Sequence, residues 1–478
     1  MLKVLYVASE AVPFVKTGGL ADVAGSLPKA LAGLGVDVRV MLPKYAEIPK
    51  EYRDKMKHIY HGAINVSWRE KYVGVDELKM NGVTFYFVDN EEYFGRDGFY
   101  GYGDDAERFS FFSRAVLNLL PEIDFWPDII HSNDWHTALV SVFLKLEHMG
   151  DERYEKIRTM FTIHNLKYQG VFPKNIMGDV LGLSWDYFNN GDLEYYDAVN
   201  FMKGAIIYAD CITTVSRTYA EEIQYPFFGE GLDGLLRSRS NALFGIVNGI
   251  DYDVYNPHTD KALAVNYGVN EMVKKVDNKM ALQKELHLPR SPRTPLVGMV
   301  SRLVEAKGLD LVIRVLDELL EHEDMQFVII GVGDKVYEDW FRELAWRRPD
   351  KVSVNIFFNN DLAQRIYASS DLFLMPSLFE PCGIGQLIAM KYGAVPVVRS
   401  TGGLEDTVKP YNKSTGEGNG FTFPNYNAHE LMYSVKRAFG LYRDMQSWQV
   451  VVRNAMITDF GWYKSAQEYK SLYERIKK

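Results

Sequence analysis

Residues 1–42 decide the fold, and they read MLKVLYVASE AVPFVKTGGL ADVAGSLPKA LAGLGVDVRV ML. Lys3–Ala8 is almost continuously apolar, which is typical of a strand buried on both faces of a sheet. Ser9–Gly19 has the composition of a loop, and Leu20–Leu34 repeats its apolar residues with the period of a helix. Val36–Leu42 is a second strand pattern. The order strand, loop, helix, strand predicts an α/β fold with a parallel sheet.

The same alternation continues along the chain and then begins again. In the first half, further strands are expected at Asp128–Ser132, Arg158–Ile163 and Cys211–Ser216. In the second half we expect strands at Leu296–Ser301, Gln326–Gly331, Val352–Phe357, Asp371–Met375 and Val395–Val398, with helices that include Leu309–Leu320 and Ile384–Tyr392. Two successive series of this kind predict two doubly wound domains instead of one continuous sheet.

The domain boundaries follow from where the pattern stops and restarts. Residues 246–292 form the connection, and we place the break near Gly249. The first domain is therefore expected to span residues 1–248 and the second residues 249–459. The last segment, residues 460–478, has a helical pattern from Trp462 onward and is expected to fold back onto the first domain.

Composition excludes several classes of protein. The 478 residues are 47% hydrophobic and 24% charged, as in ordinary globular proteins, and the formal net charge is −9. That charge argues against nucleic acid or an anionic membrane as the main partner, although a local basic pocket for a small anion remains compatible with it. No secretory signal is recognisable at the start, and no apolar run reaches the ~20 residues that span a bilayer. Two distant cysteines indicate no disulfide framework, so a cytoplasmic location is expected.

A lysine followed by two glycines lies between the first strand and the first helix, in Lys16-Thr17-Gly18-Gly19. Residues 17–22, TGGLAD, are nearly repeated as TGGLED in residues 401–406. Paired glycines at a helix start let backbone N–H groups approach an anion, and the lysine adds a mobile charge that suits a diphosphate or a sugar hydroxyl. Two tight turns without a ligand are the alternative. Neither a Walker motif nor G-x-G-x-x-G is present, which disfavours a nicotinamide cofactor.

Two further motifs follow strands in the second half. Arg302 and Lys307 come after Leu296–Ser301, at the carboxyl end of a parallel strand, where open α/β sheets bind ligands. We predict that these two cations bind phosphate, and the alternative is that they are solvated surface side chains. Glu380 precedes Cys382 and Gly383 at the start of another helix, where a carboxylate can accept sugar hydroxyls. A glutamate that only interacts with the helix dipole is the alternative, and Cys382 is interpreted as a packing residue.

Polar and aromatic residues stand at the ends of two expected strands of the first half, in His131-Ser132-Asn133-Asp134-Trp135-His136 and in Thr162-Ile163-His164-Asn165. They are interpreted as the polar rim of a sugar pocket with Trp135 as its apolar wall. A metal site is the alternative, but no further carboxylates stand at ligand spacing, so no metal is expected. The aromatic run Phe99-Tyr100-Gly101-Tyr102 could pack on a sugar, although most such residues are core.

Together these motifs resemble the bacterial glycogen synthase and plant starch synthase family, glycosyltransferase family 5. The matching segments are Lys16–Val23, His131–His136, Thr162–Gly170, Ser301–Lys307, Phe379–Gly383 and Thr401–Val408. The resemblance implies a GT-B fold of two Rossmann-like domains that face each other across a deep cleft. It also implies transfer of glucose from ADP-glucose to the non-reducing 4-hydroxyl of an α-1,4-glucan such as glycogen, with retention of configuration and with neither cofactor nor metal.

The resemblance also implies roles for individual residues. The catalytic set is Arg302 and Lys307 on the diphosphate, Glu380 on the glucose hydroxyls, and Asp134 and His164 near the reacting sugar. The donor-binding set is Lys16, Gly18, Gly19, Phe358, Cys382, Gly383, Thr401 and Gly402, where Phe358 matches an aromatic ring that stacks on adenine. The acceptor or sugar pocket comprises Tyr100, Trp135, His136 and Asn165. One departure is Glu305-Ala306, which stands where the family usually has a glutamine.

Two other functions are compatible with parts of this pattern. Another GT-B transferase or a nucleotide-sugar epimerase would share the scaffold without the glucan acceptor, and the motifs of the first half disfavour it. A non-catalytic glucan-binding protein would not need Arg302, Lys307 and Glu380 together. No nucleophilic carboxylate is evident, so the departing phosphate is expected to take the acceptor proton itself.

Overall fold

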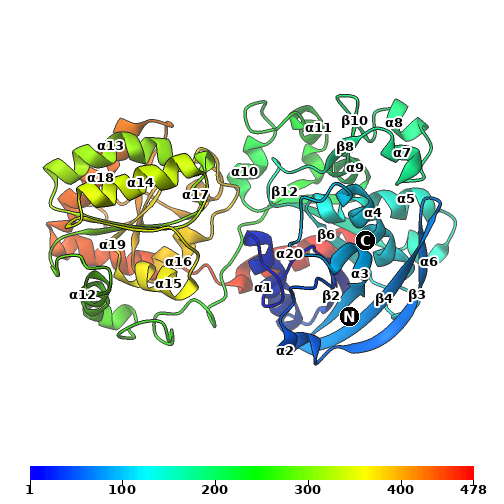
Figure 1. Ribbon diagram of the computed structural model, residues 1–478, viewed down its shortest axis with the longest axis horizontal. Helices are drawn as coiled ribbons and strands as arrows, with labels where there is room; N and C mark the ends of the chain where they lie inside the picture. Colours follow the sequence, from blue (N-terminus) through cyan, green and yellow to red (C-terminus); the bar gives the residue numbers. More distant parts are fainter. The chain divides into compact units, whose positions relative to one another are not determined.

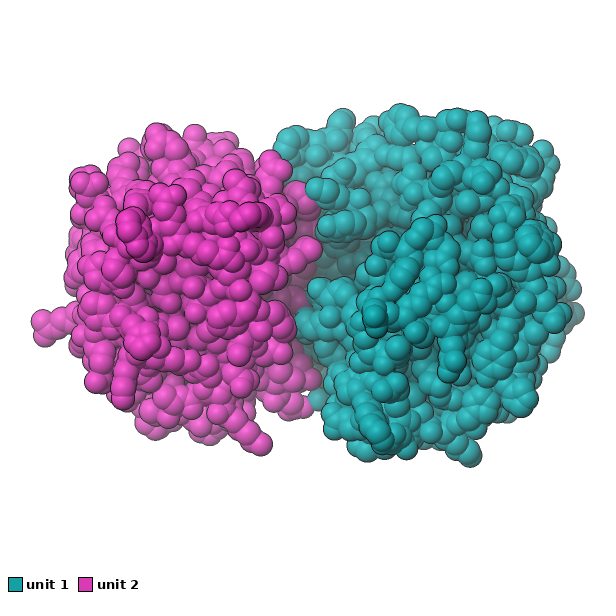
Figure 2. All heavy atoms as spheres, viewed as in Figure 1, with its two compact units in different colours: residues 1–248, 462–478 teal, residues 249–461 magenta.

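The computed structural model describes residues 1–478 and divides the chain into two compact units (Figure 2). Unit 1 comprises Met1–Asn248 together with Trp462–Lys478, and unit 2 comprises Gly249–Gly461. Each unit has its own hydrophobic core and its own parallel sheet, covered by helices. No helix combines the length and the apolar character needed to cross a membrane.

Unit 1 is built on a nine-stranded sheet with the order β12-β11-β7-β6-β1-β2-β5-β4-β3, and a small three-stranded sheet has the order β8-β10-β9. The strands are β1 (Lys3–Val7), β2 (Asp37–Pro43), β3 (Lys57–Val66), β4 (Arg69–Met80), β5 (Val83–Asp89), β6 (Ile129–Asn133), β7 (Arg158–Ile163), β8 (Val171–Pro173), β9 (Glu194–Tyr195), β10 (Ala198–Asn200), β11 (Cys211–Thr214) and β12 (Leu243–Gly245). The helices are α1 (Gly19–Gly33), α2 (Lys50–Arg53), α3 (Glu91–Phe94), α4 (Asp105–Asn118), α5 (Leu139–Glu147), α6 (Glu152–Glu155), α7 (Ile176–Asp179), α8 (Asp186–Asn189), α9 (Phe201–Tyr208), α10 (Arg217–Glu222), α11 (Asp233–Ser238) and α20 (Trp462–Lys477).

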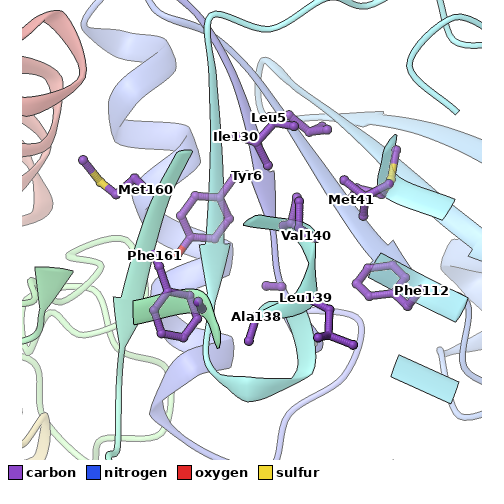
Figure 3. Packing of buried hydrophobic residues seen from close by; sticks show 14 of the residues in the cluster. Leu5, Tyr6, Met41, Phe112, Ile130, Ala138, Leu139, Val140, Met160 and Phe161 are labelled. Atoms are coloured by element: carbon purple, nitrogen blue, oxygen red, sulfur yellow. The ribbon is translucent and has the colours of Figure 1, made fainter. Parts of the chain in front are cut away.

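Seven neighbouring strands of the large sheet, β12 to β5, run parallel, and β5, β4 and β3 are paired antiparallel. Most residues of the parallel strands are buried because helices cover both faces of this part of the sheet. Figure 3 shows Tyr6 of β1, Ile130 of β6 and Phe161 of β7 in this core, with Val140 of α5 among them, and all four are fully buried. The long antiparallel pair β3–β4 was not expected from the sequence.

Unit 2 is built on a six-stranded parallel sheet with the order β15-β14-β13-β16-β17-β18. The strands are β13 (Leu296–Val300), β14 (Gln326–Ile330), β15 (Val352–Asn355), β16 (Leu372–Met375), β17 (Val395–Arg399) and β18 (Phe421–Phe423). The helices are α12 (Lys275–Glu285), α13 (Leu309–His322), α14 (Lys335–Arg347), α15 (Asn360–Ser369), α16 (Gly385–Lys391), α17 (Gly402–Thr407), α18 (Ala428–Tyr442) and α19 (Met445–Ile457). Figure 1 shows α13, α14 and α18 on one face of this sheet and α15, α16 and α19 on the other.

The expected strand Val352–Phe357 ends two residues early, at Asn355. Phe357 and Phe358 therefore lie in the short segment before α15, and Asn359 caps that helix by accepting a hydrogen bond from the N–H of Leu362. Because β15 ends at Asn355, both rings lie outside it and are not divided between the two faces of a strand.

The last helix, α20, belongs to unit 1 although it follows unit 2 in the sequence. It packs beside α1, and both lie next to each other in Figure 1. Its Tyr473 is fully buried, and the phenol hydroxyl lies 2.6 Å from Nδ1 of His131 in β6. The other ring nitrogen of His131 lies 2.6 Å from Oγ1 of Thr162. Both nitrogens of this buried ring are thus satisfied, one of them by the end of the chain.

We predict that Tyr473→Phe lowers the free energy of unfolding by about 1–3 kcal/mol, because it leaves a buried ring nitrogen without a partner. Urea denaturation followed by fluorescence measures this difference. Tyr463→Phe is the matched control, since Tyr463 lies on the same helix but is 63% exposed. Equal unfolding free energies for the two variants would show that the bond to His131 does not anchor α20.

Candidate functional site

In each unit the motif residues collect where the strand order reverses. In unit 1 the chain leaves β1 toward β2 and returns on its other side at β6, and in unit 2 the reversal lies between β13 and β16. Loops that follow these strands turn away in opposite directions, and such switch points are where open α/β sheets bind ligands. Asp134 follows β6 directly, and Lys307 and Glu380 follow β13 and β16.

Asp134 is the centre of the group in unit 1. One of its carboxylate oxygens accepts a hydrogen bond of 2.8 Å from the N–H of His164, and the N–H of Asn165 also donates to it. Burial raises the pKa of Asp134 to about 7, and the nearby charge of Glu10 adds to the increase, whereas the two N–H donors oppose it. The backbone of Asp134 is in the left-handed region, at φ 55°, as residues at functional turns often are. Burial therefore favours the protonated form of this carboxyl group more than in an exposed aspartate.

His164 is held in one orientation by Asn133. The ring Nε2 of His164 lies 2.9 Å from Oδ1 of Asn133. The same oxygen accepts a hydrogen bond of 2.9 Å from the hydroxyl of Tyr6. The amide nitrogen of Asn133 donates to the carbonyl of Val7, which identifies Oδ1 as the acceptor facing the histidine. Nε2 of His164 therefore carries the proton. Burial lowers the pKa of His164 to about 3, so the ring is neutral at pH 7 and Nδ1 is an acceptor.

Aromatic rings surround His136. Its ring lies 4.3 Å from that of Tyr100 and 4.0 Å from that of Trp135, measured between centroids. The hydroxyl of Tyr100 donates to Ser9 at 2.8 Å. Burial holds the pKa of His136 well below its ordinary value, and its buried Nδ1 has no hydrogen-bond partner in the structure. The three rings thus pack on one another in a neutral aromatic cluster in which His136 is buried.

His131 is not part of the polar rim that the sequence suggested. It is fully buried beneath the site, and its two ring nitrogens lie against Tyr473 and Thr162. Burial lowers the pKa of His131 to about 3, so the ring stays neutral. The sequence could not separate it from His136 and His164, because all three follow or end apolar strands.

The Lys16–Gly19 turn is bound by a carboxylate from the preceding loop, Glu10, which no motif in the sequence indicated. Glu10 is 3% exposed, and one of its oxygens accepts bonds from the N–H of Thr17 at 2.5 Å and from the hydroxyl of Thr17 at 2.8 Å. The N–H of Gly18 also donates to Glu10. The amides that were expected to face an anion are thus occupied from within the chain. Lys16 itself forms an ion pair of 2.8 Å with Asp22 in α1.

In unit 2 an ion pair joins two of the motifs. Nζ of Lys307 lies 2.5 Å from Oε2 of Glu380, and the hydroxyl of Ser377 donates to the same oxygen at 3.1 Å. Glu380 is only 6% exposed, whereas Lys307 is half-buried. Arg302 is exposed, and none of the ion pairs in the structure includes it. The lysine and the arginine are therefore not equivalent, because Lys307 is paired with a buried carboxylate whereas Arg302 is exposed to solvent.

Close backbone contacts hold the loop of Glu380 in place. A Cβ on Gly402, at φ 46°, would lie 2.0 Å from the carbonyl oxygen of Glu380, so only glycine fits there. The N–H of Gly403 donates to that carbonyl at 3.1 Å, and Nε of Arg399 donates to the carbonyl of Ser377 at 2.8 Å. The second TGG motif thus supports the Glu380 loop with its backbone.

The remaining residues of unit 2 fall into two groups. Thr401, Gly402, Cys382 and Gly383 surround the Glu380 loop, and Thr401 and Cys382 are buried. Phe358 lies apart from them, after the edge strand β15, and is 75% exposed. An aromatic ring this exposed is not a core residue. No group of three or more histidine, cysteine or acidic side chains in residues 1–478 has the arrangement of a metal site.

Family models match both units of the chain. The starch synthase catalytic domain model matches residues 3–238, and the glycosyl transferases group 1 model matches residues 284–448. The glycogen synthase of Desulforamulus reducens is 56% identical over 475 residues, which cover 99% of each chain. The glycogen synthase of Caldicellulosiruptor bescii is 53% identical, again with 99% of each chain covered.

Solved structures show the same relationship. The catalytic domain of starch synthase IV from Arabidopsis thaliana, bound to ADP and acarbose, matches with a TM-score of 0.92 and 36% identity, covering 100% of this chain and 99% of that one. Sucrose-phosphate synthase from Thermosynechococcus elongatus, at 16% identity and a TM-score of 0.62, shares the fold alone. The chain therefore belongs to the glycogen synthase and starch synthase family of glycosyltransferases, which have the GT-B fold.

Proposed function

We propose that this protein transfers glucose from ADP-glucose to the non-reducing 4-hydroxyl of an α-1,4-glucan, with retention of the anomeric configuration. The observation that carries the proposal is its 56% identity to a glycogen synthase over 99% of both chains. In unit 2, a buried glutamate bonded to a lysine at the switch point supports the same chemistry. Cys211 and Cys382 are both buried and form no disulfide, which suits a protein that works in the reducing cytoplasm.

Unit 2 is proposed to hold the nucleotide-sugar. Breaking the glucose–phosphate bond leaves negative charge on the diphosphate, and Arg302 and Lys307 are proposed to stabilise it as it develops. The Glu380 carboxylate accepts two hydrogen bonds within the chain, from Lys307 and Ser377, and both go to Oε2. Oε1 is then proposed to accept a hydroxyl of the glucose. In this arrangement Glu380 binds the sugar and is not a nucleophile.

Unit 1 is proposed to contribute the groups near the reacting sugar. Nδ1 of the neutral His164 can accept a sugar hydroxyl, because Asn133 holds the ring proton on the other nitrogen. Asp134, when ionised, can stabilise positive charge that develops on the sugar. No protein group is needed as the base, since the departing phosphate can accept the proton of the acceptor hydroxyl. Trp135, His136, Tyr100 and Asn165 are proposed to line the acceptor side.

A donor panel tests the proposed function directly. ADP-, UDP- and GDP-glucose are each incubated with glycogen, and released nucleotide and product linkage are measured. We expect ADP-glucose to be preferred, UDP-glucose to be a poorer donor, and every new linkage to be α-1,4. A different acceptor, or nucleotide release without glucan extension, would favour another GT-B transferase. No turnover with any donor would favour a glucan-binding protein.

Lys307→Ala is predicted to lower turnover about 10²–10³-fold, the loss expected when one electrostatic contact to a developing charge is removed. Lys335→Ala is the matched control, because Lys335 is an exposed lysine of the same unit that pairs with Asp339 on a helix surface. Initial rates at saturating ADP-glucose and glycogen measure the difference. Near-normal turnover in a folded Lys307→Ala variant would remove Lys307 from the catalytic set.

Phe358→Ala is predicted to raise the KM for ADP-glucose more than it lowers turnover, since the base lies far from the breaking bond. Stacking of an aromatic ring on a base contributes about 1–3 kcal/mol. Phe357→Ala shows which of the two adjacent rings acts, and Trp346→Ala provides an exposed aromatic of the same unit as the control. An unchanged KM in Phe358→Ala would show that this ring is not the platform for the base.

A further inference from the structure

Arg108 is a fully buried cation whose contacts within the chain satisfy only part of its guanidinium group. It lies in the first turn of α4, and its Nε donates to the carbonyl of Tyr93 at 2.8 Å. Nη1 donates to the carbonyl of Phe99 at 3.2 Å and to Oδ1 of Asp105 at 2.5 Å. Nη2 is buried and has no hydrogen-bond partner within the chain. Because arginine does not lose its charge in a protein, this donor needs an acceptor that the chain does not supply.

Two further buried polar atoms near Arg108 also have no partner within the chain. They are the hydroxyl of Tyr45, two residues after β2 ends, and Nδ1 of His136. Tyr45 is 1% exposed and His136 is 8% exposed. The Tyr45 ring packs on Phe99 and the His136 ring on Phe109, with centroids 5.0 and 4.8 Å apart. Arg108 bonds to the carbonyl of Phe99 and precedes Phe109 in the chain, so the three atoms belong to one buried region.

The charge of Arg108 acts on both of these groups. Burial raises the pKa of Tyr45, and the charge of Arg108 opposes that increase. Burial also holds the pKa of His136 well below its ordinary value, and there the same charge adds to the decrease. At pH 7 the phenol therefore keeps its proton and the imidazole is neutral. Arg108 can only donate, whereas the neutral imidazole has one donor and one acceptor nitrogen, so a group that joins them must accept as well as donate.

Arg108 also helps to position the loop that carries Tyr100. It forms an ion pair of 2.5 Å with Asp105, and the other oxygen of Asp105 accepts a hydrogen bond of 2.8 Å from the N–H of Gly101. The ring of Tyr100, one residue earlier, lies 4.3 Å from the ring of His136. The same arginine is thus linked to His136 through this loop and through the buried region that contains the three unpartnered atoms.

We propose that ordered water bound by Nη2 of Arg108 connects this guanidinium to the Tyr45 hydroxyl and to Nδ1 of His136, so that Arg108 and Tyr45 are positioning residues for His136. Water can accept from Arg108, donate to Nδ1 and still bond to a hydroxyl. A buried water makes about three such bonds to polar groups that have no other partner. Its hydrogens point away from the positive guanidinium, so Nδ1 accepts and the ring proton of His136 lies on Nε2.

The orientation of this water decides what His136 offers to a ligand. Nδ1 is the only nitrogen of the ring that is both buried and unpartnered, so Nε2 is the nitrogen left for a bound sugar. Nε2 then donates a hydrogen bond to a sugar oxygen. This role of Nε2 rests on the proposed function, which assigns His136 to the acceptor side. The water does not depend on it, because it follows from the three unpartnered atoms.

Tyr45→Phe tests the water through the sign of its effect on stability. A buried hydroxyl without a partner is costly, so its removal would raise the melting temperature, whereas the loss of a bond to water lowers it. We expect a fall of about 2–4 °C, as the loss of one hydrogen bond produces in a unit of this size. Tyr154→Phe is the matched control, since Tyr154 is a buried tyrosine of the same unit that donates to the carbonyl of Leu117 at 3.1 Å. Its melting temperature is expected to fall by a similar amount.

Kinetics separate positioning of His136 from stability alone. We expect Tyr45→Phe to lower turnover about 5-fold, the effect of one hydrogen bond, and Tyr154→Phe to leave turnover unchanged despite its similar loss of stability. The KM for ADP-glucose is expected to stay within about twofold in both variants, because the nucleotide is assigned to unit 2. Initial rates with ADP-glucose and glycogen measure these values. Equal turnover in the two folded variants would overturn the positioning role.

A crystal structure of the unaltered protein, at a resolution that shows ordered waters, tests the water directly. We expect density for water within hydrogen-bonding distance of Nη2 of Arg108. No density there, or a higher melting temperature in Tyr45→Phe, would overturn the proposal. Histidine ¹⁵N spectra, assigned with His136→Gln, are expected to show the proton on Nε2, and a proton on Nδ1 would contradict the orientation of the water. If the donor panel gives no glucan extension by the unaltered protein, the proposed function fails, while the density still decides whether the water is bound.

Discussion

The site in each unit depends on one constraint, the parallel pairing of strands around a point where their order reverses. β1 pairs in parallel with both β2 and β6, and β13 with both β14 and β16. Parallel pairing brings the carboxyl ends of neighbouring strands to one edge, and the reversal separates the loops that follow them. Residues far apart in the sequence, such as Lys307 and Glu380, meet only because of this geometry.

The three carboxylates at these edges are buried, and each accepts hydrogen bonds from a neighbouring segment. Glu10 accepts from the turn before α1 and Asp134 from the loop after β7, whereas Glu380 accepts from the side chains of Lys307 and Ser377. A buried charge without such partners would be strongly destabilising. The loops are therefore positioned by the same hydrogen bonds that make the charged side chains tolerable. This preorganisation is what electrostatic catalysis requires.

The two TGG motifs have similar sequences but different surroundings. The first turn is occupied by the carboxylate of Glu10, which comes from the loop after β1. The second approaches the backbone of the Glu380 loop so closely that a Cβ on Gly402 or Gly403 would collide with it. The first motif thus contacts a side-chain carboxylate, whereas the glycines of the second admit a neighbouring backbone. The likeness of the two motifs alone does not distinguish these uses.

The sequence by itself determined the elements and the family, because apolar periodicity and motif order are local properties of the chain. The expected strands appear within two residues of their expected bounds, and β15 ends two residues early, at Asn355, before the capped start of α15. Only the tertiary structure decided which polar residues are buried supports and which are exposed. His131 became a core residue because α20 returns to unit 1, and Glu10 became part of the Lys16 turn because the loop after β1 folds back on α1. Both depend on contacts between segments whose separation along the chain no local pattern records.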